Sequence, residues 1–195
     1  MGHVVILSGG GMTMCVRRMP LLLVLCCCCV FARAAGAQDE ELDGPKHVFH
    51  DSLLNNMVGA WTLNGKIAGR QAQHTVTAEW VLNHQFLRIH EKDENPPRDK
   101  VLPYEAIVML GYDNTSERYV AHWTDIYGGR FSETLGYGAR TGDEIRFTFE
   151  YPDGPFHTTF RWQPGLGQWQ WLMEGKSKGQ WKEFADVTLV RRKNP

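Results

Sequence analysis

The chain has 195 residues, of which 43% are hydrophobic and 22% charged, and its formal net charge is −1 at pH 7. This length and composition suit one globular domain with a sizeable core. The near-neutral charge lacks the basic face that binding to nucleic acid requires, and we interpret the one basic cluster, at positions 191–193, as a solvated tail.

The first 37 residues have the order of a secretory leader. Arg17 and Arg18 precede an apolar run at positions 19–31, and the small residues Ala35-Gly36-Ala37 precede an acidic stretch. This order predicts a signal peptide at 1–37, and the apolar run is too short to span a bilayer. We therefore expect a secreted or periplasmic protein without a membrane span, although a retained membrane anchor is the alternative.

Removal of this leader would change the chemistry of the chain. All five cysteines lie at positions 15 and 26–29, and all 22 acidic residues lie after position 37. The mature protein would therefore be more acidic than the full chain. It would also have no disulfide, no thiol nucleophile and no cysteine metal site, so its core alone must stabilise it.

A short polar segment and a helix are predicted before the first strand. Positions 38–44 are polar and are expected to form a disordered linker ahead of a single domain at 45–195. Apolar residues then recur at helical spacing from Pro45 to about Met57. Pro45 suits the first turn of a helix, and one helix placed before a barrel commonly caps its end.

From Gly59 onward the chain reads as ten short alternating runs, each closed by a turn, without a helix-length segment between them. The predicted strands lie at 59–66, 74–81, 86–91, 104–112, 118–126, 130–138, 144–151, 156–163, 168–176 and 180–192. Hairpin-length links make neighbouring strands antiparallel. The sequence therefore predicts an all-β, up-and-down antiparallel barrel of about ten strands, because closure hides the sheet edges.

Alternation along these strands produces one apolar face and one polar face, which fits a barrel with an apolar interior. Either the aromatic side chains fill this interior, or a ten-strand barrel is wide enough to leave an apolar pocket. We favour the pocket. Ten residues are its predicted ligand-binding residues: Trp61, Trp80, Arg88, Tyr104, Trp123, Asp125, Tyr137, Phe147, Trp162 and Trp171.

The most specific prediction of ligand contacts concerns two pairs of residues within the strands. Trp123 and Asp125 share a strand face, and Arg88 and His90 share a face with Phe86. Polar groups on an apolar inner wall would orient the head group of a ligand. The alternative is that these groups pair with one another across the barrel mouth and stabilise closure.

Several short motifs resemble those of a known family. Gly59-x-Trp61, just after a short helix, resembles the Gly-x-Trp signature of lipocalins and their calycin relatives. The ordered series at 53–61, 79–87, 110–113 and 119–125 is similar to a family of uncharacterised bacterial secreted proteins with a lipocalin-like or calycin-like barrel. This resemblance extends over most of positions 53–192. It implies a barrel with a small-ligand pocket and without an established enzymatic activity.

A more distant resemblance is to nitrobindin, a ten-strand haem barrel whose iron is held by one histidine late in the chain. Here the last histidine is His157, so the final two strands offer no such ligand, and His122 or His157 would have to replace it. The histidines are scattered, without H-x-H or H-E-x-x-H spacing. The residues therefore predict no metal site and no cofactor.

The function predicted is non-catalytic binding of a small hydrophobic ligand, and no catalytic residue is assigned. Three alternatives stay open: a haem-binding barrel, a periplasmic enzyme that uses cavity carboxylates such as Asp125 or Glu133, and an interaction module with a filled interior. Nucleic acid is not an expected partner, and the oligomeric state is left open.

Overall fold

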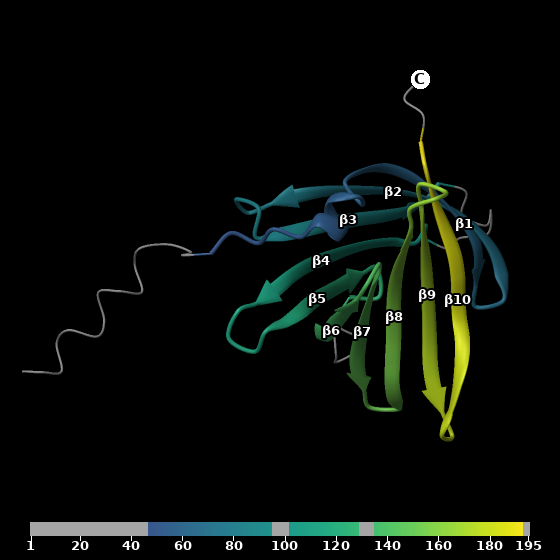
Figure 1. Ribbon diagram of the computed structural model, residues 1–195. Coiled ribbons are helices and arrows are strands. Elements are labelled where there is room, and N and C mark those ends of the chain that lie inside the picture. The colour runs from purple at the N-terminus through teal and green to yellow at the C-terminus, as the bar shows by residue number, and fades with distance from the viewer. Residues whose placement is uncertain (1–46, 95–101, 129–134, 193–195) are drawn as a thin grey trace, which may run out of the picture. The chain divides into compact units, whose positions relative to one another are not determined.

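The computed structural model describes residues 47–94, 102–128 and 135–192, which form one helix and ten strands (Figure 1). The predicted leader at 1–37, the linker at 38–44, Pro45 and Glu133 lie outside these residues. Within the described part of the chain, no helix has the length and apolar character needed to cross a membrane.

Helix α1 (Ser52–Asn55) is a single turn, so the prediction of a helix from Pro45 to Met57 was too long for the residues that are described. The cause is Asp51, which has extended backbone angles and accepts a hydrogen bond from the backbone N–H of Leu54 at 2.8 Å. An aspartate that caps in this way fixes the helix start at the next residue. The first strand then begins only four residues after the helix ends.

The strands follow the predicted order with small changes at their ends. They are β1 (Gly59–Ile67), β2 (Arg70–Val81), β3 (Phe86–Asp93), β4 (Glu105–Asp113), β5 (Arg118–Asp125), β6 (Leu135–Thr141), β7 (Glu144–Tyr151), β8 (Gly154–Gln163), β9 (Gln168–Ser177) and β10 (Gln180–Arg191).

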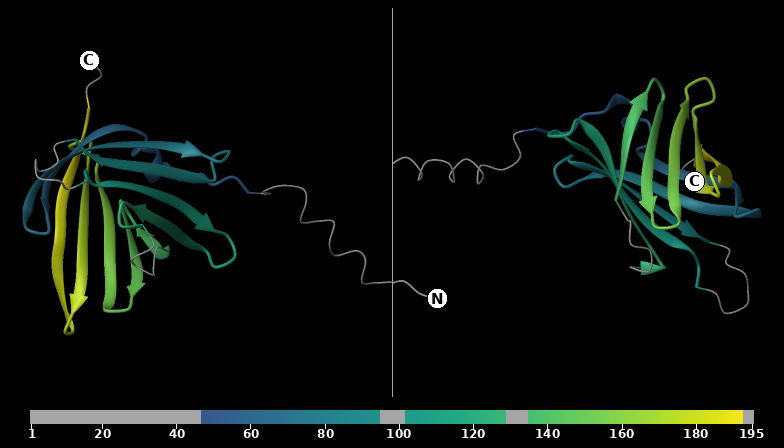
Figure 2. Two further views of the ribbon diagram at one scale, coloured as in Figure 1. Left: turned by 180° about the vertical axis from the view of Figure 1, so that it is seen from behind. Right: turned by 90° about the horizontal axis from the view of Figure 1, so that it is seen from below.

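Each strand pairs antiparallel with its neighbours in the chain, and β1 also pairs with β10, which closes the barrel. The register places Trp61 opposite Arg191 across this closing seam. In Figure 1 the strands β8, β9 and β10 run side by side while β2, β3 and β4 run across them, as the twist of a closed sheet requires. Figure 2 shows the β9–β10 hairpin at the opposite end of the barrel from the C-terminal end of β10. The predicted ten-strand up-and-down barrel with one short helix is confirmed.

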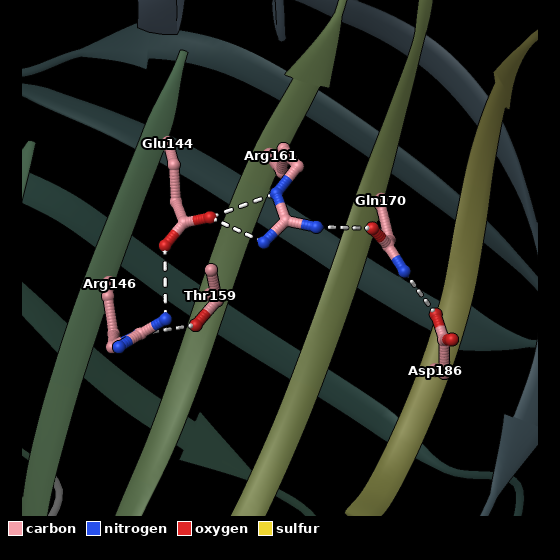
Figure 3. A network of polar contacts seen from close by, with 6 residues as sticks. All are labelled: Glu144, Arg146, Thr159, Arg161, Gln170 and Asp186. Carbon is pink, nitrogen blue, oxygen red and sulfur yellow. Dashed lines mark hydrogen bonds and ion pairs between the residues drawn. The ribbon is translucent and has the colours of Figure 1, made fainter. Parts of the chain in front are cut away.

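The outer face carries polar side chains that pair across strands β7 to β10 (Figure 3). Arg161 donates two hydrogen bonds to Glu144, at 2.9 and 2.7 Å, and a third to the side chain of Gln170 at 3.1 Å. Gln170 in turn donates to Asp186 at 2.9 Å. These pairs are largely solvated, so they favour the strand register more than they add to stability.

The end of the barrel next to α1 is packed solid. Leu53, Leu54 and Met57 of the helix region are buried against the inner side chains, and the Trp61 indole donates a hydrogen bond to the backbone oxygen of Met57 at 2.7 Å. Trp162 lies against both Trp61 and Trp169. The helix therefore caps this end, which we call the helix end.

Strand β6 contributes almost no side chain to the interior. Gly136 and Gly138 face inward, and a Cβ atom at either position would lie 2.7 Å from a phenyl ring, of Phe149 and Phe147 respectively. The two glycines thus make room for the rings of β7 inside the barrel. The residue between them, Tyr137, faces outward.

Candidate ligand-binding cavity

The end of the barrel away from α1 contains a cavity of about 1020 Å³, lined by residues of every strand except β4 and β6 and by a few residues that flank the strands. This volume is at the upper end of the range found for small-molecule sites. Ten strands enclose more space than the side chains fill here. The interior is therefore filled at the helix end and hollow at the other.

The floor of the cavity is aromatic. Trp123 meets Phe149 edge to face, with ring centroids 6.3 Å apart, and lies 5.6 Å from Trp171 beneath it. Tyr151 stacks on Phe149 at 6.1 Å and continues this surface toward the cavity mouth. Such rings offer a large apolar contact area with few internal rotations to restrict.

One wall of the cavity carries a buried acid–histidine pair. His74 of β2 and Glu91 of β3 both face inward, and the His74 Nδ1 atom lies 2.6 Å from the Glu91 Oε1 atom. Burial by itself lowers the pKa of His74, but the hydrogen bond and charge of Glu91, together with the charge of Asp93, outweigh it and raise the pKa above its usual value. The pair therefore has its strongest attraction when the imidazole is protonated.

Tyr104, just before β4, joins this polar wall to the aromatic floor. Its ring stacks on His74 with centroids 6.0 Å apart, and its hydroxyl lies beside the indole of Trp123. Burial raises the pKa of Tyr104 far above its usual value, and the negative charges of Glu91 and Asp125 raise it further. The phenol is therefore neutral, and it lies within the field of both carboxylates.

Acidic groups outnumber basic groups among the described residues that line the cavity. Four carboxylates line it, whereas the basic lining residues are Arg70 and His74. The carboxylates are Glu91, Asp93, Asp125 and Asp153. The described lining thus combines a large aromatic surface with more acidic than basic side chains.

Three of the ten predicted binding residues, Tyr104, Trp123 and Asp125, line this cavity together. Four others face inward but belong to the packed interior, away from the cavity lining: Trp61, Phe147, Trp162 and Trp171. Trp80 lies under α1, where its indole donates to the side chain of Asn55 at 2.8 Å and stacks on His84. Sequence alternation correctly assigned these five side chains to the inward face of the strands. It does not show how far along the barrel axis each side chain lies.

Arg88 and Tyr137 lie on the outer face, so the prediction that they line the interior was wrong. Leu87, Ile89 and Glu91 are the inward residues of β3, and Arg88 forms an ion pair with Glu79 on the outside. His90 likewise lies on the outer side, where it bonds to Glu105 at 2.7 Å. The Arg118 guanidinium covers the Tyr137 ring at 3.8 Å.

The two histidines suggested as haem ligands also face away from the cavity. His122 is exposed between the inward residues Ala121 and Trp123, and His157 stacks on the outer Trp181 at 3.8 Å. Burial, followed by the charge of Arg146, lowers the pKa of His157. These residues do not fit a haem held in this cavity. Among the residues that the structure describes, no group of three or more His, Cys, Asp or Glu side chains is placed to hold a metal ion.

Sequence reasoning missed His74 and Glu91 as site residues, although a signal was present. His74 continues the inward alternation of Val76 and Ala78, and Glu91 continues that of Leu87 and Ile89. Two neighbouring strands thus each place one ionisable residue at the end of an apolar face. Because an unpaired charge is costly inside a barrel, such a coincidence points to a pair.

Comparison with protein-family models matches residues 48–191 to one family, described as "Protein of unknown function (DUF1579)". This match includes the helix, all ten strands and every described residue of the cavity lining. A search of curated proteins found no match to the chain.

Proposed function

Because the chain belongs to the DUF1579 family, whose description assigns no function, we propose a function from its cavity: the barrel binds one small, mainly apolar molecule and does not transform it. The observation that carries this proposal is the cavity of about 1020 Å³ above an aromatic floor. Trp123 is the residue on which the ligand would rest, because it is held from below by Trp171 and from the side by Tyr104.

Binding would be driven by the burial of apolar surface. Each square ångström removed from water contributes about 25 cal/mol, from which the cost of ordering the ligand is subtracted. The floor is already packed against the filled half of the barrel, so little protein ordering is needed. Removal of the Trp123 indole should therefore weaken every ligand, whatever its head group.

A fluorescent probe tests this proposal directly. N-phenyl-1-naphthylamine, which is uncharged at neutral pH and brightens in apolar surroundings, should bind one equivalent per chain. Ala72 lines the cavity from β2, so an Ala72→Trp variant should fill the space and abolish probe binding. Val190→Trp, on the exposed side of β10, is the matched control and should bind like the wild type.

The outcomes are distinct. Saturable binding that is lost in Ala72→Trp and retained in Val190→Trp supports the cavity as the site. Binding that persists in Ala72→Trp would place the probe elsewhere and contradict the proposal. The Trp123→Ala variant adds a second check: unchanged affinity together with reduced stability would remove Trp123 from the site.

We also propose that the protein is exported, so that it meets its ligand outside the cytoplasm. The support is the sequence of residues 1–37, with its basic, apolar and small-residue regions in order. N-terminal sequencing of the protein from its source cells should begin at Gln38. A mature chain that retains the apolar run would contradict export by signal-peptide cleavage.

A further inference from the structure

The strand register brings two cavity carboxylates into one row. Glu91 of β3 is paired with Ala106 of β4, and Ala106 is paired with Asp125 of β5. All three face inward, and two strand spacings place the Cα atoms of Glu91 and Asp125 about 10 Å apart. Ala106, which lies between them in this row, is buried, and both carboxylates line the cavity.

The Glu91 carboxylate has one oxygen that accepts no hydrogen bond from the described residues. Its side chain is 1% exposed, and its Oε1 atom bonds to His74. Its Oε2 atom is buried and receives no hydrogen bond from the described residues. A buried carboxylate oxygen without a donor is costly to a folded protein, and a cationic N–H group from a ligand would satisfy it.

Within the described part of the cavity wall, the basic groups are fewer than the acidic groups. His74 can supply one compensating charge to Glu91, and Arg70, the other basic lining residue, is exposed at the start of β2. Among the described lining residues, Glu91, Asp125 and Asp153 alone outnumber the two basic groups, so the balance of this set is negative even when both are protonated. An anionic head group would be repelled from this end of the cavity.

The rings beside this row also favour a cation. Tyr104 lies close enough to both carboxylates to feel their charge, and it contacts Trp123 on one side and Tyr127 on the other. Aromatic faces attract organic cations, most strongly in sites shielded from water. Acidic and aromatic groups thus converge on the same part of the cavity.

We propose that the ligand is an amphipathic amine: an apolar body that rests on the Trp123 floor and a protonated amino group that lies at the cavity wall formed by Glu91 and Asp125 and donates a hydrogen bond to Glu91 Oε2. This inference rests on the proposed binding function and adds the chemical class of the ligand. A protonated amine is favoured over a quaternary ammonium group because the acceptor at Glu91 needs an N–H donor.

Three probes of equal length separate the head group from the apolar body: 4-phenylbutylamine, 4-phenyl-1-butanol and 4-phenylbutyrate. Their dissociation constants are to be measured by isothermal titration calorimetry at pH 7 with the full mature chain. We expect the amine to bind at least tenfold more tightly than the alcohol, and the carboxylate to bind most weakly. Equal affinity for all three would overturn the amine assignment and leave the apolar site standing.

Two variants test the placement of the amino group. Glu91→Gln keeps the shape and one acceptor for His74, and Asp125→Asn is a second removal of charge that does not touch the buried pair. Each should weaken the amine at least fivefold and change the alcohol by less than twofold. Glu150→Gln, an exposed carboxylate on the outer face of β7, is the control and should change neither.

Failure of the amine assignment and failure of the binding function give different results. If Glu91→Gln and Asp125→Asn weaken the amine no more than Glu150→Gln does, the proposed position of the amino group is wrong. If none of the three probes binds at millimolar concentration and the naphthylamine probe also fails, the binding function itself is wrong. An alcohol that binds while the amine does not would overturn the amine class alone.

Discussion

The guanidinium of Arg191 lies 4.2 Å over the indole of Trp61, and so joins the last strand to the first at the helix end of the barrel. The same guanidinium donates hydrogen bonds to the backbone oxygens of Val58 and Asn56, at 2.9 and 3.0 Å. The interpretation of this arginine as part of a solvated tail was therefore wrong. Its contacts give a structural role to the Gly59-x-Trp61 motif, because the tryptophan is held between the helix and the end of β10.

Replacement of this arginine should destabilise the barrel. Arg191→Ala removes two hydrogen bonds from a charged donor and one cation–π contact at a partly solvated site, so we expect a loss of about 1–2 kcal/mol in the free energy of unfolding. Urea denaturation measures this change. Arg192→Ala is the neighbouring control and should change stability by less than about 0.5 kcal/mol. Equal effects of the two variants would show that the contacts with Trp61 and the helix contribute nothing.

Asp51 should be a second point of stabilisation at the helix end. Its buried carboxylate caps α1, accepts a hydrogen bond from the Tyr119 hydroxyl and pairs with Arg140 at 3.2 Å. Burial and the bond to Asp51 raise the pKa of Tyr119 to about 12, so this phenol stays a donor at neutral pH. Asp51→Ala should cost about 2–4 kcal/mol, since it removes a cap and leaves buried donors unpaired.

A double-mutant cycle with Tyr119→Phe isolates the contribution of the Asp51–Tyr119 hydrogen bond to stability. If Asp51 and Tyr119 interact as described, the double variant Asp51→Ala/Tyr119→Phe should lose less stability in urea than the two single variants together. Additive losses would contradict a direct contribution from the bond between them. Ser52→Ala, at an exposed residue of the same helix, is the control.

Addition of one methyl group at Gly136 should disturb both stability and binding. The new Cβ atom would lie 2.7 Å from the ring of Phe149, which lines the cavity, so this ring must move. We expect Gly136→Ala to cost about 1–3 kcal/mol, as overpacking does. It should also reduce the affinity for the naphthylamine probe. A neutral effect would mean that the Phe149 ring can shift freely.

Gly165→Ala is the matched control for this substitution. It lies in the β8–β9 turn, and a Cβ atom there meets no heavy atom within 4 Å. It should therefore leave both stability and probe binding close to those of the wild type, because there is no neighbour to displace. Thermal unfolding and the probe titration can be run on both variants side by side.

The His74–Glu91 pair should make stability depend on pH. The pKa of His74 in the folded protein is raised above 6.5, so its contribution is fully present below pH 6.5 and is lost as pH rises through the folded value. Glu91, Asp93 and Tyr104 are the ionisable groups that face it. The stability advantage of the wild type over His74→Gln should therefore shrink from pH 6 to pH 9 in urea denaturation.

Two results would contradict this link between the protonation of His74 and stability. An advantage that stays constant over this pH range would mean that the charge of His74 contributes nothing. An advantage that grows with pH would mean that folding lowers the pKa of His74. His122→Gln, at an exposed position of β5, is the control and should show no such dependence.

The architecture could be predicted from the sequence because strand alternation is a local property. Runs such as Ile145, Phe147 and Phe149 show their inward face without reference to any other strand, and short turns force antiparallel neighbours. Ambiguity arose where both faces carry mixed residues. In β3 the pattern of Phe86, Arg88 and His90 competed with that of Leu87, Ile89 and Glu91, and the wrong face was chosen for Arg88.

The amino-acid order alone was enough to establish ten strands, their connection and an interior rich in aromatic rings, since each of these follows from residues close together in the chain. Only the tertiary structure determined which end of the interior is hollow. The row that contains Glu91, Ala106 and Asp125 exists only because three strands adopt one register, and closure through β1 and β10 fixes which end the helix fills. Register and closure are set by the packing of all ten strands at once, so no single stretch of sequence contains them.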